Sequence, residues 1–151
     1  MTYRIVYGQN GRAAAWCVDQ GWSMGDTSQS IALERDGRLV AVALFDDYRG
    51  SDIRLHLARD PDQHFGPRAY IAAIWRYAFV QLPCVRVSGL INEKNAASIR
   101  LAEHAGFKYE TRLSRAFRGE DLLVFVMWKN QCKFLSDRYL RTVTHETTPQ
   151  A

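Results

Sequence analysis

The chain of 151 residues has only three cysteines and lacks any long apolar run. Cys17, Cys84 and Cys132 lie far apart and form no Cys-x-x-Cys pair, which argues against a disulfide framework and against a zinc site. We therefore expect no metal and a reducing compartment. No stretch approaches the length of a membrane span, and residues 1–12 hold no signal-like apolar segment. These absences together predict a cytoplasmic protein.

Basic residues are present but nowhere concentrated. The 20 basic side chains comprise 16 Arg and 4 Lys, the net charge is +4, and the pI is about 9.1. A nucleic-acid binder usually gathers such charge on one face or arm, and no run of basic residues occurs here. We interpret the charge as a solvated basic surface, with attraction to an anionic ligand or partner as the alternative. Neither a nucleic acid nor a membrane is an expected partner.

The length and composition fit one globular domain. Hydrophobic residues make up 47% of the chain and charged residues 24%, which is ordinary for a globular protein able to bury its own core. We expect a single domain over residues 1–141. The polar residues 142–151 are predicted to form a flexible tail.

The strand pattern predicts one mixed, mostly antiparallel sheet. Asp36-Gly37 lies between two apolar runs, which is the strongest short signal for a β-hairpin. A strand, a helix and another strand follow one another over residues 53–91, and such a unit makes its two strands parallel. The predicted strands span residues 2–7, 31–34, 38–45, 53–58, 84–91, 107–117 and 122–128.

Three helices are predicted, over residues 9–20, 67–82 and 95–105. In the second, Pro67 takes the first helical position, where a missing N–H does no harm, and Pro83 ends the helix. Gly106 follows the third helix and suits the left-handed conformation of a helix end. The fold class is therefore α+β (mixed α/β), with a sheet of six to seven strands and helices on both faces. The apolar stripe of the second helix consists of Ile71, Ile74, Trp75, Ala78, Phe79 and Leu82.

The loop before the second helix is a candidate site for phosphate groups. The first turn of a helix has unpartnered N–H groups and a positive dipole end, so it attracts anions. Gly66 allows close backbone approach, and Arg68 adds guanidinium donors for phosphate oxygens. An ordinary strand-to-helix loop that begins its helix with Pro67 is the competing interpretation.

A second segment carries a more specific pattern. Asn95, then Ser98, an apolar helix and Gly106-Phe107 entering a strand follow a predicted strand. This order resembles the C-terminal half of the Gcn5-related N-acetyltransferases. It is most similar to the ribosomal-protein alanine N-acetyltransferases and, through a hairpin like residues 119–121, to short phage and prophage members. The resemblance covers roughly residues 31–128. Taken singly, Asn95 and Ser98 are also what a helix N-cap and first turn would show.

The resemblance implies that the chain binds acetyl-CoA as its acyl donor. It makes residues 63–68 the pyrophosphate loop, in which Gln63 and Gly66 match the family pattern. Arg68 stands where the family has Gly or Ala, and Pro67 removes one N–H donor, so fewer backbone amides and one more positive charge would hold the pyrophosphate. The strand edge from Leu57 to Arg59 corresponds to the backbone that pairs with the pantetheine arm in this family. Asn95 corresponds to a residue that contacts that arm.

The resemblance also implies a parallel strand pair that parts to admit the thioester. Ser98 corresponds to the general acid of the ribosomal-protein branch. Ala102 replaces a Tyr that many members use as the acid, and Leu90 replaces a Glu that many use as the base. A histidine has a pKa suited to proton transfer near neutral pH, so His56 is a candidate base. A structural role for His56 is the alternative.

The sequence thus predicts an N-acetyltransferase that moves an acetyl group from acetyl-CoA to a primary amine. The acceptor is expected to be a protein or peptide, with a small-molecule amine or charged tRNA as alternatives. A phage-encoded member would act in the host cytoplasm. The competing function is a binding or structural role without catalysis, favoured by the missing Tyr and Glu. The resemblance also implies a homodimer.

Overall fold

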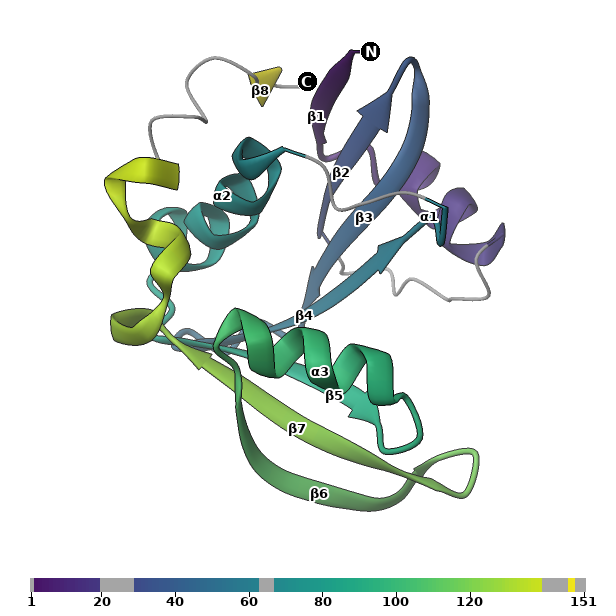
Figure 1. The fold of residues 1–151 in the computed structure, drawn as a ribbon, viewed down its shortest axis with the longest axis vertical. Coiled ribbons are helices and arrows are strands. Elements are labelled where there is room, and N and C mark those ends of the chain that lie inside the picture. The colour runs from purple at the N-terminus through teal and green to yellow at the C-terminus, as the bar shows by residue number, and fades with distance from the viewer. Residues whose placement is uncertain (1, 20–28, 63–66, 140–146, 149–151) are drawn as a thin grey trace.

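A computed structural model describes residues 2–19, 29–62, 67–139 and 147–148 of the chain (Figure 1). One sheet runs through the molecule in the order β6-β7-β5-β4-β3-β2-β1-β8. The pairs β4–β5 and β1–β8 are parallel and the others antiparallel. The strands are β1 Tyr3–Tyr7, β2 Gln29–Arg35, β3 Arg38–Asp46, β4 Asp52–Arg59, β5 Arg86–Asn92, β6 Lys108–Phe117, β7 Glu120–Trp128 and β8 Thr147–Thr148.

Helices cover both faces of the sheet. Helix α1 (Asn10–Asp19) packs on one face through a small core cluster that includes Cys17 and Leu44. Helix α2 (Arg68–Arg76) packs on the opposite face over the main core. Helix α3 (Ala96–Ala105) lies on the same side as α2, since Phe107 at its end packs against that main core (Figure 1). The predicted α+β class with helices on both faces is confirmed.

The turn residues explain the first hairpin. Asp36 and Gly37, between β2 and β3, have φ angles of 50° and 84°. Both central residues of a type I′ hairpin turn need positive φ, which Asp and Gly adopt more readily than other residues. The two strands pair from Arg35 and Arg38 to Gln29 and Phe45, so this part of the prediction is confirmed.

The second helix differs from the prediction of one continuous helix over residues 67–82. Pro67 is the N-cap rather than the first helical residue, and α2 ends at Arg76. A π-helical turn, Tyr77–Gln81, follows and is closed by a bond from Leu82 N–H to Tyr77 O of 2.9 Å. The wider turn still directs Ala78 and Phe79 into the core. The middle of the apolar stripe is therefore buried although the helix type changes, and Ile71 and Leu82 at its ends are half-buried.

The remaining elements follow the predicted order with shifted ends. Strand β5 starts at Arg86 rather than at residue 84, and Val85 before it is 49% exposed. At the C-terminus, β8 lies parallel to β1, with Thr147 opposite Ile5. The two residues of β8 add an eighth strand to the seven that run through the domain. The single domain and the flexible tail stay predictions.

Candidate functional site

A gap opens in the sheet where β4 and β5 part. The two parallel strands pair at only three positions, Asp52 with Arg86, Ile53 with Val87 and Arg54 with Ser88. After these pairs, β4 keeps register with β3 alone and β5 with β7 alone, among the strands that the structure describes. The sheet therefore forms a V that is closed at the start of both strands and open at their C-terminal ends. In an α/β sheet, ligands bind at such carboxyl ends.

The helix that follows β4 begins beside the open end of the V. Pro67 has an extended conformation, and its carbonyl accepts a hydrogen bond from Tyr70 N–H at 3.0 Å. Arg68 is the first residue of α2 and is exposed. Its guanidinium carbon lies 5.9 Å from the centre of the Tyr139 ring. Gln63 and Gly66, the two residues that match the predicted pyrophosphate loop, lie outside the described residues.

The helix that follows β5 begins at the other side of the gap. Asn95 is its N-cap, and the side-chain oxygen accepts a hydrogen bond from Ser98 N–H at 3.2 Å. At the other end of the helix, Gly106 is the C-cap and has a left-handed conformation with a φ of 112°. The capping roles of Asn95 and Gly106 therefore account for the sequence pattern locally. Asn95 is exposed and Ser98 is half-buried in the first turn.

The last residues of β4, which do not pair with β5, border this gap. Leu57 is half-buried and packs against the main core on the side of α2. Arg59 ends the strand, is exposed, and has Ala41 of β3 as its register partner. The predicted pantetheine edge, Leu57 to Arg59, therefore lies on the open arm of the V.

His56 points to the face opposite Leu57, the face that α1 covers further along the sheet. Its register partner is Leu44, which packs under α1. The imidazole Nε2 lies 3.4 Å from Asp46 Oδ2, and the two side chains are 28% and 25% exposed. His56 and Ser98 therefore belong to different layers: the histidine is on the α1 face, and Ser98 is on the helix that covers the α2 face.

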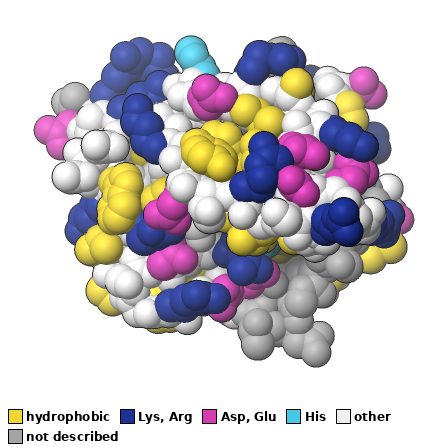
Figure 2. Space-filling view, turned by 90° about the horizontal axis from the view of Figure 1, so that it is seen from below, with side chains coloured by type: hydrophobic (Ala, Val, Ile, Leu, Met, Phe, Trp, Pro, Cys, Tyr) yellow, Lys and Arg dark blue, Asp and Glu magenta, His cyan; other side chains and the backbone are white. Residues whose placement is uncertain are grey.

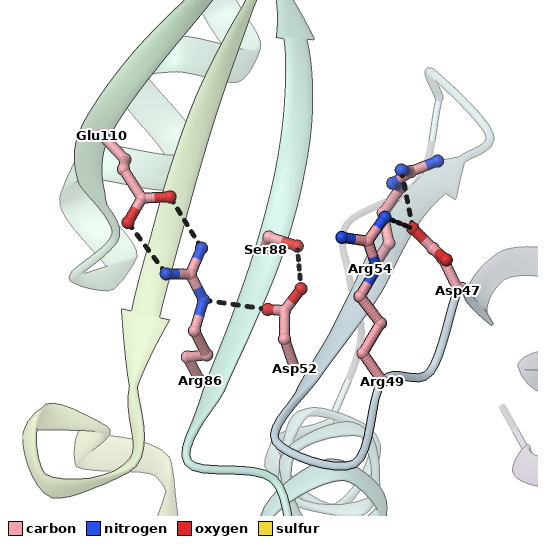
Figure 3. A network of polar contacts seen from close by, with 7 residues as sticks. All are labelled: Asp47, Arg49, Asp52, Arg54, Arg86, Ser88 and Glu110. Carbon is pink, nitrogen blue, oxygen red and sulfur yellow. Dashed lines mark hydrogen bonds and ion pairs between the residues drawn. The ribbon is translucent and has the colours of Figure 1, made fainter.

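Polar side chains join four strands at the closed end of the V (Figure 3). Arg86 Nε donates to Asp52 at 3.1 Å, and its two terminal nitrogens donate to Glu110 at 2.8 and 2.7 Å. Ser88 donates to the other oxygen of Asp52 at 3.2 Å. The hydrogen bonds from Arg86 lower the pKa of Glu110 below its usual value. Since Arg86 also lies over the ring of Trp128, this network ties β4, β5, β7 and β6 together.

Sequence reasoning missed both the contact of Asp46 with His56 and this network. The contact of Asp46 with His56 depends on the register of β3 against β4, which places Asp46 opposite Arg54, two residues from the histidine. That register was readable in principle, because the turn between the strands fixes it. The contact of Arg86 with Glu110 had no such signal, since β7 lies between their strands.

The surface charge is mixed on the face shown in Figure 2, where Lys and Arg alternate with Asp and Glu. This agrees with a solvated basic surface rather than a single-sign patch. Among the helices that the structure describes, none is long and apolar enough to cross a bilayer.

Comparison with known proteins gives structural matches only. No family model matches the sequence, and no curated protein matches it. A dodecameric spermidine N-acetyltransferase from Vibrio cholerae superposes with a TM-score of 0.70 at 14% identity, over 85% of this chain and 95% of that chain. A putative acetyltransferase from Salmonella typhimurium, yncA, with its cofactor acetyl-CoA, superposes with a TM-score of 0.64 at 17% identity, over 91% and 96%.

A third solved structure is similar over a shorter span. The Campylobacter jejuni N-acetyltransferase PseH, in complex with acetyl coenzyme A, superposes with a TM-score of 0.56 at 13% identity over 70% of each chain. At these identities the similarity concerns the fold. Together with the parted pair β4–β5 and the helix that begins after β4, it shows that the chain has the fold of the Gcn5-related N-acetyltransferases.

Proposed function

We propose that the protein is an acetyl-CoA-dependent N-acetyltransferase that acetylates a primary amine. The observation that carries the proposal is the V between β4 and β5, which has the start of α2 on one side of its open end and the start of α3 on the other. A thioester arm needs an extended channel with unpaired strand edges, and a diphosphate needs a helix N-terminus. The V and the start of α2 offer both.

We propose roles for individual residues that their positions support. Arg68, exposed at the start of α2, supplies a positive charge for the diphosphate next to Gly66 and Gln63. The backbone of β4 from Leu57 to Arg59 pairs with the pantetheine arm, and Asn95 contacts the same arm from the start of α3. Backbone N–H groups at a strand edge also stabilise the negative oxygen of the tetrahedral intermediate. Cofactor binding thus relies on backbone along the pantetheine arm and on the added charge of Arg68 at the diphosphate.

Proton transfer needs a base for the amine and an acid for the leaving thiolate. Positioned groups of this kind contribute about 10²–10⁴-fold to a rate. We assign the base to His56 on the α1 face and the acid to Ser98 in the first turn of α3. The amine then approaches from the α1 face, while acetyl-CoA lies on the side of α2 and α3.

A protein or peptide amine is the acceptor class that we propose first. Acceptor choice depends on loops that vary within a fold, so a small amine has to be compared directly. Spermidine is the appropriate small probe, because spermidine N-acetyltransferases are among the structural neighbours. The same neighbour is dodecameric, and we propose that this chain is at least a homodimer, which light scattering tests.

The test is acetyl transfer from acetyl-CoA to two probes, spermidine and a peptide with a free N-terminal alanine. Released CoA thiol and the acetylated product are measured together, because thiol release alone also reports hydrolysis. Acetylation of the peptide supports the proposal in full, and acetylation of spermidine alone replaces the acceptor class. Binding of acetyl-CoA without transfer to any amine in a broad panel would contradict the enzymatic function and support a binding role.

A further inference from the structure

We propose that Asp46 is the positioning residue of the general base: it orients His56 and selects the imidazole tautomer that can take a proton from the acceptor amine. This inference rests on the proposed acetyl transfer and adds a residue to it. The observation that carries it is the contact between His56 Nε2 and Asp46 Oδ2, 3.4 Å apart, on the two residues that flank the point where β4 and β5 part.

The backbone brings these two residues together. On adjacent antiparallel strands, Leu44 lies opposite His56 and Asp46 lies opposite Arg54. Asp46 and His56 are therefore diagonal neighbours on one face of the sheet, a separation that longer side chains bridge. His56 lies inside β4 and Asp46 is the last residue of β3, so the paired strands hold both backbones.

The environment of Asp46 favours a directed interaction. Its Oδ1 atom is buried and has no hydrogen-bond partner among the described residues. A carboxylate that is partly removed from water gains most from a donor at its accessible oxygen. Oδ2 is the atom that faces His56, which makes the imidazole N–H the donor at hand.

Nearby charges on this face are engaged elsewhere. Arg54, directly opposite Asp46, donates to Asp47 at 3.1 Å instead. Arg86 at the closed end of the V is bound to Asp52. From the side of α1, Arg12 is bound to a buried glutamate of β2. Each of these three cations thus has a carboxylate partner other than Asp46.

The chemistry follows from the tautomer. When Nε2–H points at Asp46, the lone pair of the neutral ring lies on Nδ1. The amine nitrogen attacks the thioester carbon, the C–S bond breaks, and the nitrogen gives up its proton to Nδ1. The CoA thiolate takes a proton from Ser98 or solvent, and the products are the N-acetyl amine and free CoA. The Asp46 carboxylate stabilises the imidazolium that forms, as a carboxylate does beside any protonated histidine.

The first experiment observes the tautomer directly and needs no substrate. Long-range ¹H–¹⁵N NMR of the wild-type protein above the titration of the ring should show His56 protonated on Nε2. Asp46→Asn should produce a mixture of tautomers, and Asp46→Glu should restore a part of the preference. Asp19→Asn is the matched control, because it removes the same charge from an exposed position at the end of α1. A wild-type ring protonated on Nδ1, or one unchanged by Asp46→Asn, overturns the proposal.

The second experiment links the pair to catalysis, with circular dichroism verifying that each variant is folded. His56→Gln should lower kcat by about 100-fold. Asp46→Asn should lower kcat by about tenfold with KM within about twofold, because the imidazole is then no longer held in the reactive orientation and tautomer. Asp19→Asn should leave both unchanged.

The outcomes separate this proposal from the proposed function. Active wild-type enzyme with an unaltered kcat in Asp46→Asn overturns the positioning role and leaves acetyl transfer standing. Wild-type protein that transfers acetyl to no amine overturns the proposed function and the catalytic role of the pair with it, whatever the NMR shows. A changed tautomer together with a lowered kcat at nearly unchanged KM supports the inference.

Discussion

The ion pair between Arg86 and Glu110 joins the closed end of the V to β6 at the edge of the sheet. It should contribute a measurable coupling energy to the free energy of unfolding. The pair has two parallel hydrogen bonds, of 2.8 and 2.7 Å, and bidentate geometry strengthens such pairs. The side chains are 23% and 41% exposed, so solvent screening limits the gain. We expect a coupling energy of about 1 kcal/mol, the upper end of the range for exposed pairs.

A double-mutant cycle with Arg86→Met and Glu110→Gln measures this coupling by urea unfolding at pH 7. Arg86→Met also breaks the bond to Asp52, so this variant should lose about 2 kcal/mol in all. In a domain of this size, that loss lowers Tm by about 4–8 °C. Glu103→Gln is the matched control for the charge change, because Glu103 is exposed on α3.

The same coupling should disappear in acid. The pKa of Glu110 is lowered in the folded protein by the hydrogen bonds from Arg86, so the folded state binds that proton less readily than the unfolded chain does. The stabilisation is therefore complete above the unfolded pKa of about 4.3 and is lost as the pH falls through the lower folded pKa. A coupling energy near zero at pH 7, or an equal one at pH 3, would refute this account of the network.

Three further predictions concern stability and reactivity. Tyr70→Phe removes a buried hydrogen bond of 2.9 Å to Ile31 O, and the free energy of unfolding should fall by about 1 kcal/mol; an unchanged value in denaturant titration would contradict this. Burial raises the pKa of all three thiols, that of Cys132 to about 11. Ellman's reagent at pH 8 should therefore react slowly with native protein and fully with denatured protein. Rapid labelling of native protein would contradict the burial of these thiols. Gly106→Ala forces a non-glycine residue to a φ of 112° and should cost about 1–2 kcal/mol in thermal unfolding, whereas Gly11→Ala, in open space on α1, should cost nothing.

Local signals made most of the fold predictable. The Asp36-Gly37 turn and the apolar alternation beside it depend on neighbours in sequence, and the hairpin follows from them. The same is true of the helix between Asn95 and Gly106, whose caps are its own flanking residues. These signals depend only on residues that are close in sequence, and the tertiary structure preserves the local conformations that they predict.

Features that depend on tertiary packing were not predictable. The apolar spacing through Ala78 and Phe79 is the same for an α-helix and for the π turn that the chain adopts, so periodicity predicted one long helix. The contact between Arg86 and Glu110 crosses a strand that lies between them. Of the candidate site, the sequence indicated the loop, the strand edge and the helix start, and it gave no sign of the partner of His56.

The most direct test of the account is calorimetric titration of the wild-type protein with acetyl-CoA, beside the variants Arg68→Ala and Gly66→Val. Loss of one charged contact to a diphosphate should weaken binding by about tenfold, and Arg118→Ala, which removes an equal charge from the distant β6–β7 turn, should not. The account predicts micromolar binding by the wild-type protein, weakened by Arg68→Ala and Gly66→Val alone. Well-folded wild-type protein that does not bind acetyl-CoA, or variants that bind as tightly as the wild type, would contradict the placement of the cofactor at the start of α2.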